Sequence, residues 1–265
     1  MIHIIGAGFS GLTLAWELKK AGFEVIIYEK NQVGGLIQSH RTPTHLRETA
    51  ANGVLWSPRF EALAKELGVE FHPSEPGAKK RFIFHNDKPC RWPLNFFETI
   101  QSLIAGFKFL SKMIFSNNKI SPDLTLEQWG IRSFGKPFSD VILSAAVQGI
   151  FALAPKYLNA KAVLESFKAV NAFKKAKKFK PVTYAPRNGM GELILALKQR
   201  LAEKNVPIQF QEILDLKSLK LVKEDIVVIS TSAWDASKLL PHIPALKLIE
   251  AVPVTKATLV WAKEE

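Results

Sequence analysis

The segment His3-Ile4-Ile5-Gly6-Ala7-Gly8-Phe9-Ser10-Gly11 decides the fold of this chain. An apolar start typical of a buried strand is followed by three glycines at the spacing Gly-x-Gly-x-x-Gly. Gly6 permits a tight turn, Gly8 lets a ligand approach the backbone, and Gly11 allows a helix to pack closely on the strand. The pattern predicts a strand, a turn and a helix from Gly11 to Ala21, which together begin a βαβ unit.

The same turn predicts a dinucleotide site. Free N–H groups at the start of a helix attract phosphates, and Glu29 ends an apolar strand that runs from Val25 to Tyr28. A carboxylate at that position accepts hydrogen bonds from both ribose hydroxyls and would repel a 2'-phosphate. The residues therefore favour FAD or NAD over NADP, with contacts expected from Gly6, Ala7, Gly8, Phe9, Ser10, Gly11, Glu29 and Lys30.

Composition narrows the choice of partners. The chain has 265 residues, 47% of them hydrophobic, enough for one large or two modest domains. Its formal net charge of +12 favours an acidic partner, which could be nucleic acid, an anionic membrane or a carboxylate-bearing substrate. We expect no nucleic-acid partner, because the densest basic run lacks interleaved aromatic residues. That run consists of Lys174, Lys175, Lys177, Lys178 and Lys180.

The sequence shows no signal-peptide pattern, no cysteine pair for a disulfide and no spacing typical of metal ligands. Met1 is followed at once by an apolar run with no basic n-region, and Cys90 is the single cysteine, so we expect a cytoplasmic protein. The six histidines show no metal-ligand spacing, and we identify no Ser/His/Asp or Cys/His arrangement. We therefore expect no metal site.

A second glycine motif, Val33-Gly34-Gly35-Leu36-Ile37-Gln38-Ser39, follows shortly after Glu29. A nicotinamide dehydrogenase would not need it, whereas adjacent glycines let the backbone pass close to a pyrophosphate and a ribitol. At this point the sequence resembles the flavin amine oxidase superfamily, whose members carry such a pair after the ribose-binding glutamate. The resemblance implies FAD as the cofactor, with Gly34, Gly35 and Leu36 among its contacts.

Two segments resemble the protoporphyrinogen oxidase branch of that superfamily. Glu48-Thr49-Ala50-Ala51-Asn52-Gly53 is similar to a stretch beside the flavin ring, with Ala50 in place of the usual glycine. This implies that Ala51 and Asn52 contact the cofactor and that Asn52 orients the substrate. Lys80-Arg81-Phe82-Ile83-Phe84 is similar to a strand whose arginine faces a porphyrinogen propionate, which a guanidinium can bind through two hydrogen bonds. An exposed strand arginine without a ligand is the alternative for Arg81.

Later segments extend the resemblance. The stretch from Gln148 to Ala160 is similar to a segment near the substrate, which implies that Gly149 lines the substrate pocket. Leu153 and Ala154 stand there in place of the usual glycine and aspartate. Further on, Asn188-Gly189-Met190-Gly191-Glu192-Leu193 and Ser230-Thr231-Ser232 are similar to the second section of the FAD domain. This second section implies that Ile213 packs on the adenine and that Thr231 contacts the cofactor.

The order of the expected elements indicates how the chain is divided. Strand and helix alternate up to Val69, and a strand from Arg81 to Phe84 then forms a hairpin at Asn86 and Asp87. Four helices follow, and a helix with two strands restores the α/β pattern. The helices are expected at Phe96 to Phe115, Leu126 to Phe134, Phe138 to Gln148, Asn159 to Phe173 and Glu192 to Ala202, and the strands at Val206 to Phe210 and Ile226 to Ser230.

We therefore expect an α/β protein with a discontinuous, Rossmann-like FAD-binding domain and an inserted, mainly helical region for substrate and membrane. The FAD-binding domain comprises residues 1–78 and 183–245, the inserted region residues 79–182, and residues 246–265 begin an incomplete substrate-domain sheet. The resemblance covers about three-fifths of a usual family member. It implies a shortened chain, a truncated relative, or a chain completed by a second subunit.

The resemblance implies an enzyme of haem biosynthesis that oxidises a porphyrinogen with FAD. The apolar stretch from Phe96 to Phe115 suits a buried or interfacial amphipathic helix better than a spanning one, so contact with an anionic membrane at the inner face of the cell membrane is one expectation. Two other functions stay open. One is a different superfamily enzyme for an amine or carotenoid-like substrate, and the other is a non-catalytic nucleotide-binding relative.

Overall fold

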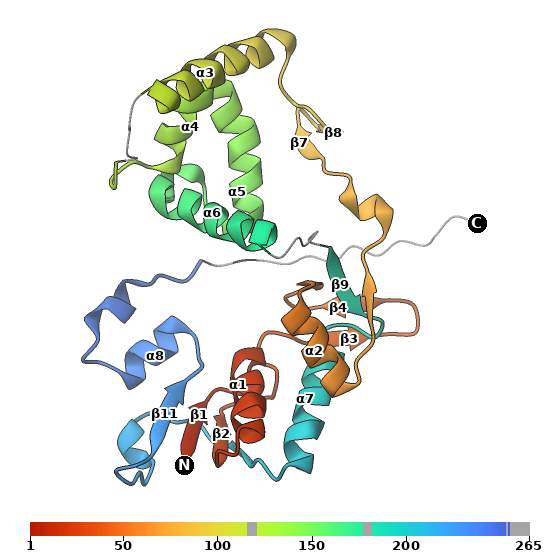
Figure 1. The fold of residues 1–265 in the computed structure, drawn as a ribbon, viewed down its shortest axis with the longest axis vertical. Coiled ribbons are helices and arrows are strands. Elements are labelled where there is room, and N and C mark those ends of the chain that lie inside the picture. Colours follow the sequence, from red (N-terminus) through yellow and green to blue (C-terminus); the bar gives the residue numbers. More distant parts are fainter. Residues whose placement is uncertain (116–120, 177–181, 253, 255–265) are drawn as a thin grey trace. The chain divides into compact units, whose positions relative to one another are not determined.

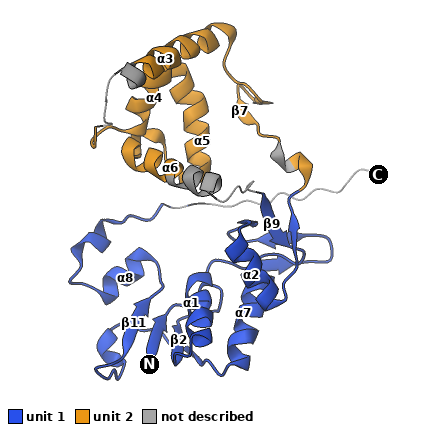
Figure 2. Cartoon of the chain, viewed as in Figure 1, with its two compact units in different colours: residues 1–74, 181–265 blue, residues 75–180 orange. Residues whose placement is uncertain are grey.

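The chain forms two compact units in a computed structural model that describes residues 1–115, 121–176, 182–252 and 254 (Figure 1). The first unit combines residues Met1–Ser74 with Pro181–Glu265, and the second comprises Glu75–Lys180 (Figure 2). The first unit is thus made from both ends of the chain.

A parallel sheet forms the centre of the first unit. Its strands lie in the order β10-β2-β1-β11, with Ile4 of β1 opposite Ile27 of β2 on one side and Val228 of β11 on the other. Strands β1 and β11 lie side by side although they come from opposite ends of the chain (Figure 1). The four strands are β1 (Ile2–Ile5), β2 (Val25–Glu29), β10 (Ile208–Phe210) and β11 (Ile226–Ile229).

Side chains of the two central strands alternate between two hydrophobic clusters. Ile4 and Ile27 are fully buried on the face covered by helices α1 (Phe9–Lys20), α2 (Pro58–Leu67) and α7 (Gly191–Glu203). Ile5 and Tyr28 belong to the cluster on the other face, which includes Ile213. Because both faces are covered, these strands are apolar at nearly every position.

Smaller elements complete the first unit. A hairpin follows the second glycine motif, and an antiparallel sheet with the order β5-β9-β6 lies beyond it. Short helices follow β10 and β11. These elements are β3 (Ser39–Arg41), β4 (Leu46–Glu48), β5 (Val54–Leu55), β6 (Phe71–Pro73), β9 (Thr183–Pro186), η4 (Leu216–Ser218), α8 (Ala233–Leu239) and η5 (Pro244–Leu248).

The second unit is mainly helical. Its buried core contains Leu126, Val147, Ala160 and Val163, and Thr125 caps a helix through reciprocal hydrogen bonds with Gln128. The elements in chain order are η1 (Pro76–Lys79), β7 (Ile83–His85), β8 (Lys88–Cys90), α3 (Phe96–Phe115), α4 (Leu126–Phe134), η2 (Phe138–Leu143), α5 (Ser144–Phe151), η3 (Pro155–Tyr157) and α6 (Ala160–Ala176).

The predicted α/β class with a parallel sheet is confirmed. The strand predicted from Arg81 to Phe84 instead begins at Ile83. Asn86 and Asp87 have φ values of +49° and +57° and form a two-residue hairpin turn. Because only three residues on each side of that turn are paired, Arg81 lies outside the strand.

Two other segments differ in detail from the expected elements. The helix predicted from Phe138 to Gln148 is divided into a π-helical turn and α5. Of residues 246–265, expected to begin a sheet, the described part contains the end of η5 and irregular backbone, and residues 253 and 255–265 lie outside the described residues. Lys177, Lys178 and Lys180 of the basic run also lie outside them.

Among the described residues, we find no helix that is both long enough and apolar enough to cross a membrane.

Candidate cofactor-binding site

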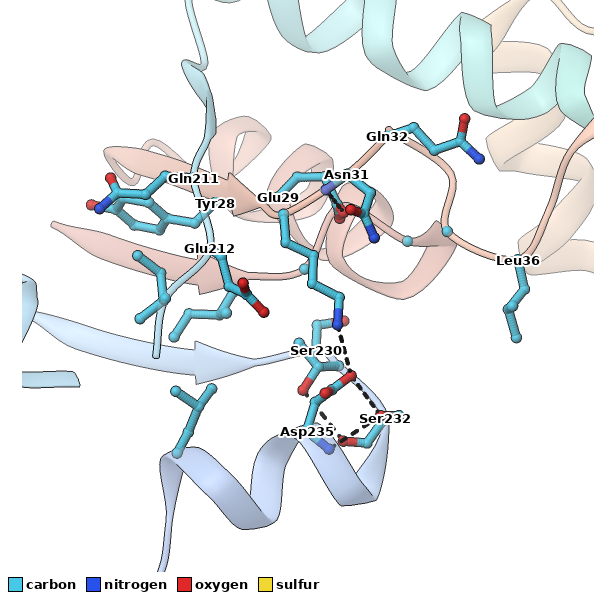
Figure 3. Close-up of a pocket in the computed structure, with 18 of the residues that line it drawn as sticks. Tyr28, Glu29, Asn31, Gln32, Leu36, Gln211, Glu212, Ser230, Ser232 and Asp235 are labelled. Carbon is cyan, nitrogen blue, oxygen red and sulfur yellow. Dashed lines mark hydrogen bonds and ion pairs between the residues drawn. The ribbon is translucent and has the colours of Figure 1, made fainter. Parts of the chain in front are cut away.

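A pocket of about 700 Å³ opens at the carboxyl edge of the parallel sheet (Figure 3). Its walls come from the segments that follow β1, β2, β10 and β11, as expected for a ligand site of an open parallel sheet. Ten of the residues predicted to bind the cofactor line it. They are Gly6, Gly8, Phe9, Glu29, Lys30, Gly34, Gly35, Leu36, Ile213 and Thr231.

The three glycines of the first turn have different neighbours. Gly6 has a φ of +108°, and a Cβ on it would lie 2.6 Å from the carbonyl oxygen of Ser230. A Cβ on Gly11 would collide with the carbonyl oxygen of Gly6. A Cβ on Gly8 would meet no described atom within 4 Å. The fold therefore requires glycine at positions 6 and 11, whereas the space beside Gly8 is left for a ligand.

The start of helix α1 is suited to an anion. Gly8 is its N-cap and supplies no side chain, and the first turn contains no acidic residue. The first N–H groups of an α-helix have no partner inside the helix and carry the positive end of its dipole. A pyrophosphate beside Gly8 would provide acceptors for these groups, so the turn fits the diphosphate of a dinucleotide.

Glu29 joins the glycine turn to the end of β2. Its side chain is buried, Oε2 accepts a hydrogen bond from the Ala7 N–H at 2.8 Å, and Oε1 accepts one from the Asn31 N–H at 2.8 Å. A carboxylate has about four lone-pair positions, so both oxygens can still accept hydrogen bonds from ribose hydroxyls. The two acceptor oxygens of Glu29 therefore fit the ribose of an ADP moiety.

The second glycine motif lies against the first. Gly34 has a φ of +102° and donates its N–H to the carbonyl oxygen of Ala7 at 2.7 Å. A Cβ on Gly35 would lie 3.5 Å from the Cα of Gly8. The two motifs thus form adjoining parts of one wall of the pocket. A diphosphate could contact the backbone of both motifs there.

Tyr28 and Ile213 provide an apolar part of the pocket. Ile213 is buried, and the Tyr28 hydroxyl is hydrogen-bonded to His3 Nδ1 at 3.0 Å. Burial, followed by the negative charge of Asp225, raises the pKa of Tyr28, so its phenol stays protonated at neutral pH. A neutral ring and an isoleucine suit an adenine base better than they suit a charged group.

Five of the residues predicted to contact the cofactor do not line this pocket. Ala7 and Gly11 are buried behind the turn, and Ser10 is exposed on α1. Ala51 and Asn52 lie in the loop between β4 and β5. The structure therefore brings together the residues expected around the ADP moiety, and it places the predicted flavin-side residues in a separate loop of the same unit.

The loop that carries Asn52 follows a hairpin held by helix α7. Glu48 Oε1 accepts a hydrogen bond from the Met190 N–H at 2.8 Å, and Ser39 Oγ accepts one from the Gly191 N–H at 2.7 Å. Ser39 in turn donates to Glu48 Oε2 at 2.7 Å. Two segments that resemble the flavin enzymes, around Glu48 and around Gly191, are thus in direct contact.

Arg81 and Gly149 belong to the second unit. Arg81 is exposed in the segment between η1 and β7. Gly149 lies in α5, and a Cβ on it would meet no described atom within 4 Å. Among the described residues, we also find no group of three or more His, Cys, Asp or Glu side chains that could hold a metal ion.

Several residues of the pocket were not predicted to contact the cofactor, although Ser230 and Ser232 lie in a segment that resembles the second section of the FAD domain. Figure 3 shows Tyr28, Asn31 and Gln32 at the end of β2, Ser230 and Ser232 on the segment that joins β11 to α8, and Asp235 in the first turn of α8. Gln211 and Glu212 follow β10. Each set directly follows or ends a parallel strand, so the predicted strand ends contained the signal that could have found them.

Replacement of Gly8 by alanine should separate ligand binding from folding. We expect Gly8→Ala to leave the thermal unfolding of the ligand-free chain unchanged, because the new Cβ meets no described atom. We expect FAD affinity to fall by at least about tenfold, because the methyl group occupies the space of the diphosphate. Isothermal titration calorimetry and a thermal melt measure the two effects.

Gly11→Ala is the matched control for that experiment. Its Cβ would collide with the carbonyl oxygen of Gly6, so we expect a lower melting temperature even without ligand. A Gly8→Ala chain that bound FAD as tightly as the unchanged chain would contradict this description of the pocket.

Comparison with known proteins agrees with this geometry. Residues 9–263 match the family described as flavin containing amine oxidoreductase. The chain is 27% identical over 182 residues to protoporphyrinogen oxidase 2, chloroplastic/mitochondrial, of Arabidopsis thaliana, a match that covers 60% of this chain and 34% of that protein. It is 26% identical over 274 residues to protoporphyrinogen oxidase of Schizosaccharomyces pombe, covering 91% of this chain and 55% of that protein. The chain thus spans about half or less of the length of these relatives.

Solved structures share the fold at lower identity. Reduced UDP-galactopyranose mutase has a TM-score of 0.64 at 17% identity, covering 90% of this chain and 57% of that one. Putrescine oxidase has a TM-score of 0.63 at 16% identity, covering 90% of this chain and 59% of that one. The family match indicates a flavin, and the pocket fits an ADP moiety. FAD contains both groups, so the predicted cofactor is confirmed. The chain belongs to the flavin containing amine oxidoreductase family, and its cofactor is FAD.

Proposed function

We propose that this chain oxidises a porphyrinogen with FAD, the reaction implied by the name of its protoporphyrinogen oxidase relatives, in haem biosynthesis. The observation that carries the proposal is the match to the Schizosaccharomyces pombe enzyme, which extends over 91% of the chain and therefore through both units. The chain's formal net charge of +12 also suits a substrate that bears several carboxylates.

The residues of the chain have separate tasks in this reaction. Bound FAD supplies a hydride acceptor, and the protein supplies binding and orientation. Glu29 and the glycine turn hold the ADP moiety of the cofactor. Arg81 binds a propionate through two parallel hydrogen bonds, Asn52 orients the macrocycle, and Gly149 leaves space for it beside α5.

A second candidate is oxidation of a different substrate, such as an amine or a carotenoid-like molecule. Leu153 and Ala154 favour it, because they replace the glycine and aspartate usual near the substrate in the enzymes that this chain resembles. A third candidate is a nucleotide-binding relative without catalytic activity. The assay below distinguishes all three, since each substrate class can be added to the same FAD-loaded chain.

We also propose that helix α3 attaches the chain peripherally to an anionic membrane on the cytoplasmic side. Phe97 is 81% exposed and Phe107 is 74% exposed, which is unusual for phenylalanine. An amphipathic helix with such residues on one side can lie in a membrane interface without crossing it. Other large exposed apolar residues on α3 are Phe96, Ile100, Leu103, Ile104 and Leu110.

Anaerobic addition of protoporphyrinogen IX to the FAD-loaded chain should bleach the visible flavin absorption. We expect Arg81→Ala to raise the substrate concentration needed for half-maximal bleaching by at least about tenfold, because a charge-assisted hydrogen bond to a propionate is lost. The dimethyl ester of the substrate has no propionate charge, so Arg81→Ala should have little effect with it.

Arg91→Ala is the control, because Arg91 is also an exposed arginine of the second unit and lies over the Phe82 ring. Equal effects of the two substitutions would exclude a specific propionate contact at Arg81. An FAD-loaded chain that no porphyrinogen bleaches, but an amine does, would support the second candidate. A chain that no substrate bleaches would support the third.

Flotation with phosphatidylserine-containing vesicles tests the membrane proposal. We expect Phe107→Asp to reduce vesicle binding by about tenfold, because burial of a phenylalanine side chain in lipid is lost. Leu195→Asp, on α7 of the first unit, is the control, since Leu195 is 66% exposed but lies on a different helix. Equal binding of the Phe107→Asp and unchanged chains would contradict the proposal.

A further inference from the structure

An ion pair joins two segments that line the FAD pocket. Lys30 directly follows β2, and Asp235 lies in α8, the helix after β11. Lys30 Nζ lies 3.4 Å from Asp235 Oδ2, and both residues line the pocket. Because β1 lies between β2 and β11 in the sheet, the pair extends across the end of the strand that carries the glycine turn.

The ion pair bridges the distance between two strands that are not neighbours in the sheet. Neighbouring strands are about 4.8 Å apart, so the ends of β2 and β11 are roughly 10 Å apart. The two residues therefore connect walls of the pocket that follow different strands, with β1 between them. Figure 3 shows Asp235 beside Ser232 on the wall opposite the end of β2.

Asp235 is held in place for this contact. Ser232 Oγ donates a hydrogen bond to Asp235 Oδ2 at 2.9 Å, and the Asp235 N–H donates one back to Ser232 Oγ at 3.2 Å. Burial alone would raise the pKa of Asp235, but the hydrogen bonds from Ser232, Lys30 and Lys238 and the charge of Lys30 outweigh it and lower that pKa. The carboxylate is therefore ionised at neutral pH and remains available to Lys30.

We propose that Lys30 and Asp235 form a clasp across the pocket that slows release of the ADP half of bound FAD. Lys30 closes over the cofactor, and Asp235 is a positioning residue that acts through Lys30. The inference rests on the FAD site described above and is independent of which substrate is oxidised. Since the two side chains are 43% and 24% exposed, the clasp is modest in strength and weakens with rising salt.

The alternative is that Lys30 contacts the diphosphate directly. This alternative predicts the opposite change in the rate of FAD release when Asp235 is replaced. If Asp235 competes with the diphosphate for Lys30, removal of the Asp235 charge frees the lysine and slows FAD release. If the two residues form a clasp, removal of either charge opens the pocket and accelerates release. The sign of the Asp235→Asn effect therefore distinguishes the two.

The test measures the rate of FAD release from the loaded chain by the recovery of flavin fluorescence after excess ADP is added. We expect Asp235→Asn and Lys30→Gln each to accelerate release by about threefold at low salt. The double variant should release FAD no faster than either single variant, because both substitutions break the same contact. Lys19→Gln is the control, since Lys19 pairs with Glu24 away from the pocket and its loss removes the same charge.

Asp235→Asn could also act by disturbing the hydrogen bonds between Ser232 and Asp235 at the start of α8. Lys30→Gln leaves both of these hydrogen bonds intact, so faster release from that variant reports loss of the ion pair alone. Unchanged or slower release from the Asp235→Asn chain, or additive effects in the double variant, would overturn the clasp. If the chain without any substitution bound neither FAD nor ADP, the cofactor site on which the clasp depends would be wrong. A chain that bound FAD normally but oxidised no porphyrinogen would contradict the proposed function and leave the clasp supported by its release rates.

Discussion

The hydrogen bond from the Ala7 N–H to the buried carboxylate of Glu29 is the constraint on which the site depends. It ties the glycine turn after β1 to the end of β2, so the start of α1 and the Glu29 carboxylate have a fixed separation. Loss of the carboxylate would leave a buried N–H group without its acceptor, which costs about 1–3 kcal/mol. One side chain thus holds the turn at the end of β2, where a carboxylate can accept hydrogen bonds from ribose hydroxyls.

The pocket also depends on pairing between distant parts of the chain. Strands β10 and β11 enter the sheet from the second half of the sequence and flank β2 and β1. Their ends bring Ile213, Thr231 and Asp235 to the same edge as the glycine turn. The helical unit is inserted between the two halves, so the cofactor pocket is closed only after residues on both sides of that insertion have folded together.

The sequence predicted those features that local chemistry determines. The spacing of Gly6, Gly8 and Gly11 indicated the turn and its ligand, because each glycine meets a steric requirement of its own. Tyr28 ends a predicted strand and could have been found there, whereas Asp235 was missed because its place in the pocket follows from strand order, which no short motif encodes. The strand at Arg81 was extended too far, since the two-residue turn at Asn86 determines which residues pair.

We expect the first unit to recognise FAD through its ADP half. Calorimetric titration of the chain with FAD, ADP and FMN tests it most directly, because FMN carries the flavin without the adenosine. We expect ADP to compete with FAD, and FMN to bind at least about tenfold more weakly than FAD. FMN binding as tight as that of FAD, with no competition from ADP, would contradict the account.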